Sequence, residues 1–238
     1  MGSNTRHLKR HSMPNAWPVK RKNISFVTRS KPGSHRREYT ITVVLLLRDV
    51  LKYVENTKEA KFVVNNQEVK VNDKVVKSIK HPVGLFDILE FPTIKEKYTI
   101  LFDENGKVKL TEKKDNNILL KVTDKKYAKG GKLQLNTMNG YNIFVDEKTF
   151  KKVNRGDTIS YDPSKKKVSS VVPLSKDSFV YVYDGKYTGK FGKVVDFVHF
   201  KGLSRDTADI EIEGETQKTL KEYCFPVGLK EEEVKALQ

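Results

Sequence analysis

The sequence predicts an α+β chain of several small domains behind a basic, extended N-terminal arm. With 238 residues, 37% of them apolar, the chain can form roughly two or three small cores. The net charge of +16 is uneven, because residues 1–40 hold ten Lys and Arg but one acid. Helical periodicity is confined to residues 41–65, and short β-rich segments with Asn-Gly and Gly-Gly turns follow.

These patterns divide the chain into four predicted segments. They are a basic arm (1–42), a helix–helix–hairpin module (43–92), a central β domain (93–174) and a small five-stranded β-barrel (175–238).

The arm shows neither helical nor strand periodicity. Basic clusters such as His7-Leu8-Lys9-Arg10-His11 and Lys20-Arg21-Lys22 carry few apolar side chains between them. Because such a segment cannot bury enough surface to offset its chain entropy, we expect it to order around a polyanion. Trp17 is the exception: we expect it to dock on the protein, with stacking on a nucleic-acid base as the alternative.

Two helices and a hairpin are predicted for the module. In residues 41–54, an apolar stripe lies opposite Arg48 and Lys52. A second helix begins at Asn56 or Thr57 and ends near Asn65. The two adjacent residues Asn72 and Asp73 then predict a tight turn between two short Val-rich strands.

The glycine-rich stretch 184–194 is the most informative part of the barrel. A strand at 179–183 precedes it, and alternating Ala208, Ile210 and Ile212 predict a half-buried strand after it. Three glycines, at 185, 189 and 192, supply positive-φ positions and let the backbone approach a partner closely. The loop interleaves basic and aromatic side chains, which suits an RNA backbone and unstacked bases: Lys186, Tyr187, Lys190, Phe191 and Lys193.

The charge and composition bound the class of partner. A surplus of this size is usually neutralised by nucleic acid, with acidic lipid as the rival. The longest apolar run, at 41–47, is seven residues including Thr42, so no membrane span is predicted. Cys224 is the only cysteine, which excludes a disulfide within the chain and fits a reducing compartment.

No catalytic constellation or cofactor motif is visible in the sequence, so we expect neither an enzyme nor a bound cofactor. A metal site is also not expected, because His7 and His11 lie near Pro14 and the cysteine is remote. The acidic stretch Glu231-Glu232-Glu233 is expected to face solvent or a protein neighbour.

Several motifs resemble known RNA-binding modules. Arg48-Asp49-Val50-Leu51, Thr57, Ala60 and the stretch 69–75 resemble the small module named after ribosomal protein S-four. The 185–194 loop resembles a KOW motif. Together with His7-Leu8-Lys9-Arg10, the 81–88 segment and Phe225-Pro226-Val227-Gly228, they resemble the archaeal and eukaryotic e-type family of small-subunit ribosomal protein S-four; the length fits its archaeal members.

This resemblance implies a structural protein of the small ribosomal subunit, located on cytoplasmic ribosomes beside other ribosomal proteins. It implies no membrane, no small-molecule substrate and no homo-oligomer. Its rRNA contacts would neutralise phosphates, which sets position without reading sequence. The residues matched to that role are Lys9, Arg10, Lys20, Arg21, Lys22, Arg29, Arg36, Arg37, Arg48, Lys52, Lys61, Lys186, Lys190 and Lys193.

Two other functions use the same modules. An RNA-modifying enzyme would need a separate catalytic domain, and residues 93–174 offer no evident one. A transcription elongation factor would use the glycine-rich loop and would copurify with RNA polymerase.

Overall fold

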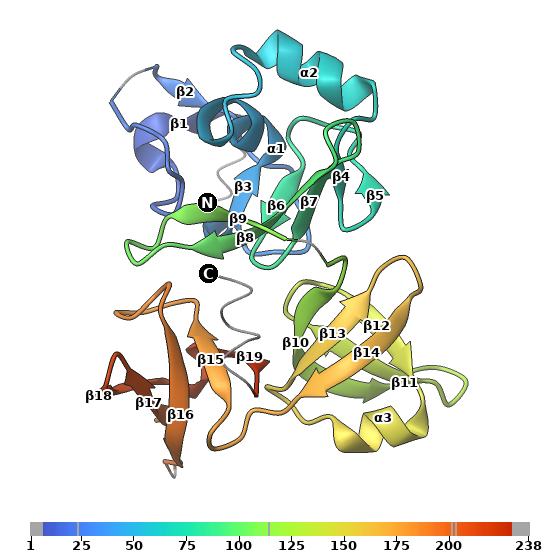
Figure 1. Ribbon diagram of the computed structural model, residues 1–238, viewed down its shortest axis with the longest axis vertical. Helices are drawn as coiled ribbons and strands as arrows, with labels where there is room; N and C mark the ends of the chain where they lie inside the picture. The colour runs from blue at the N-terminus through green and yellow to red at the C-terminus, as the bar shows by residue number, and fades with distance from the viewer. Residues whose placement is uncertain (1–6, 23, 114, 201, 203, 230–238) are drawn as a thin grey trace. The chain divides into compact units, whose positions relative to one another are not determined.

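The computed structural model describes residues 7–22, 24–113, 115–200, 202 and 204–229. The chain forms two compact units (Figure 1). The first is Met1–Leu101 with Lys107–Glu112, and the second is Phe102–Gly106 with Lys113–Gln238. Each unit is described below by itself. The acidic stretch at 231–233 lies outside the described residues.

The basic arm is folded in the first unit, so the prediction that it has no structure of its own is wrong for its described part. Strand β1 (Leu8–Lys9) pairs antiparallel with β2 (Phe26–Val27), and a 3-10 turn (Arg10–Ser12) lies between them in sequence. The apolar residues are too scattered to form a periodic pattern, but each enters the unit's core. The buried ones are Leu8, Met13, Trp17 and Val27.

Trp17 docks on the protein, as predicted. Its side chain is 2% exposed, and its indole N–H donates to the carbonyl of Thr40. The neighbouring carbonyl of Ala16 accepts a 2.7 Å hydrogen bond from the amide of Val108. Residues 16 and 17 therefore join the arm to the body of the first unit.

The first predicted helix is shorter than expected. Strand β3 (Thr40–Thr42) pairs with β6 (Pro82–Gly84), α1 (Val43–Leu45) follows β3, and a π-helical turn (Leu46–Val50) continues it. Residues 43–47 are all buried rather than only one stripe, so packing on every side replaces the amphipathic pattern. A 3-10 turn (Arg37–Tyr39) precedes β3.

The second helix and the hairpin are as predicted. Helix α2 (Thr57–Asn65) begins after Asn56, whose side-chain oxygen accepts the amides of residues 58 and 59. In return, Glu59 accepts the amide of Glu55 at 2.8 Å. Strands β4 (Lys70–Val71) and β5 (Lys74–Val75) flank Asn72 and Asp73, both at positive φ as a two-residue hairpin requires.

The predicted boundary between residues 92 and 93 falls inside a sheet. Strands β7 (Ile88–Phe91), β8 (Glu96–Phe102) and β9 (Val108–Glu112) extend the hairpin into the order β5-β4-β7-β8-β9. Strand β7 pairs with β8 over all four of its residues. The helix–helix–hairpin module therefore needs two further strands to complete its sheet.

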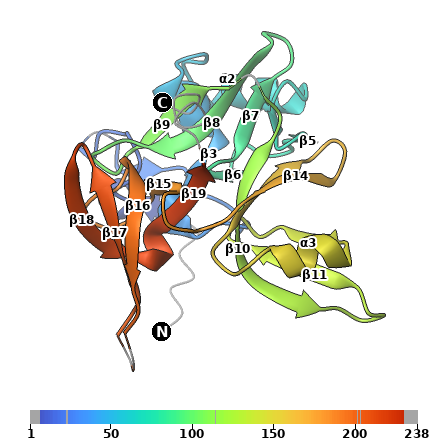
Figure 2. The same ribbon diagram turned by 60° about the horizontal axis from the view of Figure 1, so that its bottom comes forward.

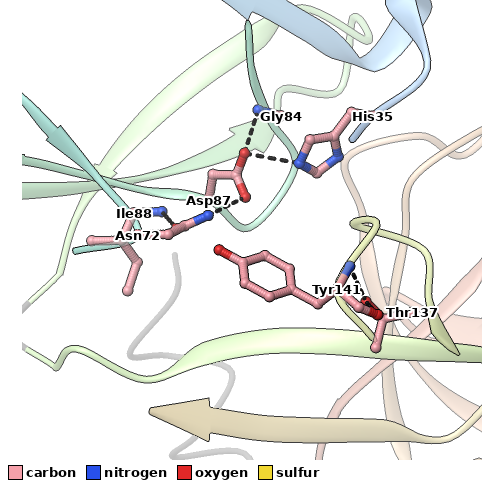
Figure 3. A network of polar contacts seen from close by, with 7 residues as sticks. All are labelled: His35, Asn72, Gly84, Asp87, Ile88, Thr137 and Tyr141. Atoms are coloured by element: carbon pink, nitrogen blue, oxygen red, sulfur yellow. Dashed lines mark hydrogen bonds and ion pairs between the residues drawn. The ribbon is translucent and has the colours of Figure 1, made fainter. Parts of the chain in front are cut away.

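The second unit contains two five-stranded sheets. The central one has the order β12-β11-β10-β13-β14, and it includes a short helix that the sequence did not predict. Thr137 closes the β11–β12 turn with two 3.1 Å hydrogen bonds to the backbone of Tyr141, both drawn in Figure 3. The elements are β10 (Ile118–Tyr127), β11 (Leu133–Thr137), β12 (Asn142–Val145), α3 (Glu147–Lys152), β13 (Thr158–Asp162) and β14 (Lys167–Val172).

The second sheet has the predicted strands but not a closed barrel. Its order is β18-β17-β16-β15-β19, with β18 and β19 as the outer strands (Figure 2). Ala208, Ile210 and Ile212 are buried as their alternation predicted. The elements are β15 (Phe179–Val182), β16 (Phe191–Val198), β17 (Thr207–Ile212), β18 (Glu215–Leu220), a 3-10 turn (Lys221–Tyr223) and β19 (Cys224–Gly228).

A buried lysine links the two sheets of this unit. The ammonium of Lys121, on β10, donates to the carbonyl of Glu222 at 2.7 Å and to that of Cys224 at 2.6 Å. Burial lowers the pKa of Lys121 to about 8. Both carbonyls thereby receive a charged donor.

Candidate nucleic-acid interface

The arm presents most of its predicted RNA-binding residues to solvent. Lys9, Lys20, Arg21, Lys22, Arg36 and Arg37 are exposed, and Arg29 is half-buried. The guanidinium of Arg21 donates to the side chain of Asn15 and, at 3.3 Å, to the carbonyl of His11. These bonds hold Arg21 in place while it stays exposed, so part of its side-chain entropy is lost before any RNA binds.

Arg10 is a correction to this set. Its side chain is 4% exposed, and its guanidinium donates to the carbonyl of Lys20. The amide of Arg10 donates to the carbonyl of Ser25 at 2.9 Å. Arg10 therefore fixes the loop that displays residues 20–22 and is not itself open to a phosphate.

The basic turn at residues 31–37 is attached to the first unit by a buried polar network (Figure 3). The imidazole of His35 lies 2.8 Å from Asp87, which also accepts the amide of Gly84 at 2.8 Å. Asn72 donates to the other oxygen of Asp87 and accepts the amide of Ile88, both at 2.8 Å. One carboxylate thus joins the turn, the β4–β5 hairpin and the residue at the end of β6.

The electrostatics of this network follow from burial and pairing. Burial opposes a charged imidazole, but the charge of Asp87 and the hydrogen bond to it outweigh burial and raise the pKa of His35. Burial likewise opposes a charged carboxylate. Contacts with His35, Asn72 and the amide of Gly84 outweigh that effect and lower the pKa of Asp87. Both groups are stabilised in their charged forms.

Glycine is required where the turn meets β6. A Cβ atom on Gly84 would lie 2.4 Å from the imidazole ring of His35. A Cβ atom on Gly33 would lie 2.3 Å from the ring of Pro82. The 81–88 segment therefore packs directly against the basic turn.

The module's predicted RNA-binding residues are less uniform. Lys61 on α2 and Lys52, which has a φ of 58°, are exposed. Arg48 is half-buried, pairs with Asp49 at 2.8 Å and donates to the hydroxyl of Thr57 at 3.2 Å. The neighbouring carboxylate offsets part of the charge that Arg48 would offer to a phosphate.

The glycine-rich loop has a rigid frame. Gly185 and Gly189 have positive φ, as expected, whereas Gly192 lies within β16 with an ordinary backbone. A Cβ on Gly189 would meet the backbone of Asp103 at 2.5 Å, and one on Gly192 would meet Ile210 at 2.4 Å. These glycines serve close packing within the unit, which sequence spacing alone could not distinguish from approach to a partner.

Two of the loop's three lysines have acidic partners. Lys190 pairs with Glu213 at 2.9 Å, and Lys193 pairs with Asp177 at 2.8 Å. Lys186 is exposed, with its ammonium 5.3 Å from the ring centre of Tyr187. The loop therefore presents less net charge than its lysines suggest.

Phe26 is a surface residue that the sequence reasoning missed. Phe26 is 54% exposed, and its backbone pairs with that of Lys9 across β1–β2. The ring of Phe26 lies 5.7 Å from the ring of His7. An aromatic side chain inside a basic segment was the available signal. Exposed aromatic rings beside cations are the usual surfaces for base stacking.

The described residues contain neither a metal-binding cluster nor a membrane-spanning helix. Over these ranges, no group of three or more His, Cys, Asp or Glu side chains could hold a metal ion. Over the same residues, no helix has the length and apolar character needed to cross a bilayer.

Two family models match the sequence: one described as the ribosomal family S4e, over residues 94–168, and the RS4NT domain, over residues 1–38. The small ribosomal subunit protein eS4 of Methanocaldococcus jannaschii is 34% identical over 97% of both chains. That of Methanococcus maripaludis is 35% identical over 94% of both. The chain belongs to the ribosomal family S4e.

The solved structure of an S4e protein agrees. The crystal structure of the 30S ribosomal protein S4e from Thermoplasma acidophilum has a TM-score of 0.67 and 25% sequence identity, covering 81% of this chain and 97% of that one. The RS4NT match, over residues 1–38, includes Lys20, Arg21 and Lys22. The S4e-model match begins just before β8 and ends at the start of β14.

Proposed function

We propose that this S4e-family chain is a structural constituent of the small ribosomal subunit and binds small-subunit rRNA. The observation that carries the proposal is the exposed Lys20-Arg21-Lys22 loop on a fixed frame. Trp17 and Arg10 anchor the segment on either side of Pro14, and within the described part of the chain no carboxylate forms an ion pair with the three side chains of the loop. Preformed cations of this kind neutralise phosphates with little loss of entropy.

The names of the relatives support the same proposal. The matched proteins from Methanocaldococcus jannaschii and Methanococcus maripaludis are named small ribosomal subunit proteins, and they align over nearly the whole chain. We therefore place the chain in the ribosome of the cytoplasm, next to rRNA and other ribosomal proteins. The relatives give no support to an RNA-modifying enzyme or an elongation factor.

Within this proposal, the exposed arm residues carry more of the binding than the glycine-rich loop. Lys186 is the loop's candidate for phosphate contact, because Lys190 and Lys193 already pair with carboxylates. A KOW-type role for the loop and phosphate contact by Lys52 and Lys61 belong to the proposal. Arg48 contributes less, since Asp49 lies 2.8 Å away.

Alanine substitution of Lys20, Arg21 and Lys22 together tests the proposal. Binding to small-subunit rRNA from the same organism is measured across a salt series, and a matched variant replaces the exposed Lys165, Lys166 and Lys167. Both variants lose three charges. We expect the first to weaken binding at least ten-fold more than the second and to reduce the log–log salt slope by about 2 to 3.

Two results would contradict the proposal: equal losses in the two variants, or wild-type protein that does not sediment with small subunits. Deletion of the whole arm is a poorer test. It would also remove Leu8, Met13, Trp17 and Val27 from the core, so lost binding could not be separated from lost folding.

A further inference from the structure

The two-stranded ribbon of β1 and β2 (Figure 1) has one buried and one exposed face. Residues directly opposite each other in an antiparallel pair project to the same face. Leu8 and Val27 are opposite each other, and both are buried. Lys9 and Phe26 are the next opposite pair, and both are exposed. The ribbon therefore packs on the first unit through one face and presents the other.

Lys9 and Phe26 are close neighbours across the ribbon. The amide of Arg10, one position after Lys9, donates at 2.9 Å to the carbonyl of Ser25, one position before Phe26. This hydrogen bond makes Lys9 and Phe26 a non-hydrogen-bonded pair, the kind in which opposite side chains are closer to each other. A cationic side chain therefore neighbours an exposed aromatic ring.

His7 lies on the same face and contacts the ring. It is two positions before Lys9, and strand residues two positions apart project to one face. Its ring centre is 5.7 Å from that of Phe26, at an interplanar angle of 57°. A tilted contact of this kind steadies the phenyl ring without stacking flat against it. The phenyl ring thus keeps the open surface that a stacked base needs.

The ribbon is ordered before any ligand binds. Leu8 and Val27 belong to the core of the first unit, and the guanidinium of Arg10 donates to the carbonyl of Lys20. A ligand that stacks on Phe26 therefore does not have to order the backbone that carries the ring. Binding to a surface that is already ordered costs less entropy.

The charge around the ring favours a ligand that carries phosphate. Residues 1–40 hold ten Lys and Arg and a single acid, Glu38. An apolar protein segment would leave the cations of this face without counter-ions, and a basic segment would be repelled by them. A nucleotide offers an anion for Lys9 and a flat ring for Phe26, so it uses both members of the exposed pair.

We propose that the exposed face of this ribbon binds an unpaired RNA nucleotide, with its base stacked on Phe26 and its phosphate at Lys9. The proposal rests on the proposed function for the nature of the ligand, and it adds a site that distinguishes single-stranded from paired RNA. A base inside a duplex is stacked on both sides and has no free face for the phenyl ring.

The test compares Phe26→Leu with Phe26→Trp in the full-length protein. Leucine keeps an apolar side chain but lacks the aromatic face, whereas tryptophan keeps both. The probe is a short single-stranded oligouridine with one central 2-aminopurine, and a fully paired RNA duplex of equal length is the reference. We expect Phe26→Leu to bind the single strand about 5- to 100-fold more weakly and to lose quenching of 2-aminopurine. Phe26→Trp should retain both, and duplex affinity should not change in either variant.

The salt dependence separates stacking from charge. Phe26→Leu removes no phosphate contact, so its log–log salt slope should equal that of wild type, whereas Lys9→Ala should reduce the slope by about 0.7. Ile94→Ala is the matched control, because Ile94 lies in the β7–β8 turn of the same unit and is 53% exposed, against 54% for Phe26. It should bind both probes like wild type. Thermal unfolding of each variant shows that the fold persists.

Wild-type affinity of Phe26→Leu for the single strand would overturn the proposal, as would equal losses for strand and duplex or an equal loss in Ile94→Ala. So would intact RNA binding with defective uptake into small subunits, which would assign this face to a protein neighbour. Each of these results leaves the proposed function standing, because that fails only if wild-type protein does not bind rRNA or sediment with small subunits.

Discussion

His35 and Asp87, 52 positions apart in the sequence, form an ion pair of 2.8 Å inside the first unit, with side chains 3% and 4% exposed. The pair attaches the basic turn at 31–37 to the β4–β5 hairpin through Asn72 (Figure 3). A buried pair of this kind is strongly destabilising to break, because the remaining partner stays charged without a counter-ion. The display of Arg36 and Arg37 therefore depends on this contact.

The pH dependence of stability should report this pair. The pKa of His35 is raised above its ordinary value of 6.5, so its contribution is complete below pH 6.5 and is lost as pH rises through the higher folded value. The pKa of Asp87 is lowered from 3.8, so its contribution is complete above pH 3.8 and is lost as pH falls through the lower folded value. The pair stabilises the fold most between these limits.

We therefore predict that His35→Gln destabilises the protein by roughly 3 kcal/mol near pH 5.5 and by less near pH 9. Denaturant unfolding at the two pH values measures the difference. His199→Gln is the control, since His199 is exposed and pairs with Asp206 at the surface. An equal loss for His35→Gln at both pH values would contradict the assignment.

Trp17 should contribute more to stability than any other residue of the arm. We expect Trp17→Ala to cost about 3–5 kcal/mol in denaturant unfolding, because a cavity remains and the carbonyl of Thr40 loses its donor. Phe26→Ala removes an aromatic ring that is 54% exposed and should cost less than about 1 kcal/mol. Circular dichroism follows the unfolding of both variants, because Trp17→Ala removes the only tryptophan and therefore its fluorescence signal. Similar losses would mean that the arm is not docked.

Arg10 and Lys22 should separate folding from RNA binding. Arg10→Met should lower the free energy of unfolding by about 1–3 kcal/mol, since the carbonyl of Lys20 loses its donor. Its salt slope for rRNA binding should stay near the wild-type value. Lys22→Ala should leave stability unchanged and reduce the slope by about 0.7 to 0.9. A reduced slope for Arg10→Met would return Arg10 to the RNA contacts.

Gly189 and Gly214 form a matched pair, because both have a φ of 86°. Alanine at Gly214 meets no atom within 4 Å, so only backbone strain of roughly 1–2 kcal/mol is expected. Alanine at Gly189 adds a Cβ at 2.5 Å from the backbone of Asp103 and should cost several kcal/mol more. Thermal unfolding compares the stability of the two variants. Equal losses of stability would show that the loop at Gly189 shifts to make room for the Cβ atom.

The sequence predicted the local structure well wherever neighbouring residues determine it. The cap at Asn56, the turn at Asn72 and Asp73, and the alternation of β17 are all local signals, and the structure has each of them. The family resemblance also held, since the relatives align over nearly the whole chain. The phosphate contacts stay predictions, although the exposure of Lys20 and Lys22 suits them.

Features that depend on distant residues were beyond sequence reasoning. Arg10 could not be distinguished from Lys9, because its burial depends on the path of the loop back to Lys20. The arm's core contribution was missed because Leu8, Met13 and Trp17 show no period. The boundary at residue 92 was misplaced because the pairing of β7 with β8 is a matter of tertiary structure.

Lys121 also has a consequence for the order of events during synthesis. Its acceptor on Cys224 lies 103 positions later, and β19 pairs with β15 in the same sheet. Until residue 228 has emerged from the exit tunnel, β15 lacks its partner strand β19. The buried ammonium of Lys121 then also lacks its two carbonyl acceptors. The second unit should therefore mature after translation of β19, whereas the first can fold while the ribosome is still elongating the chain.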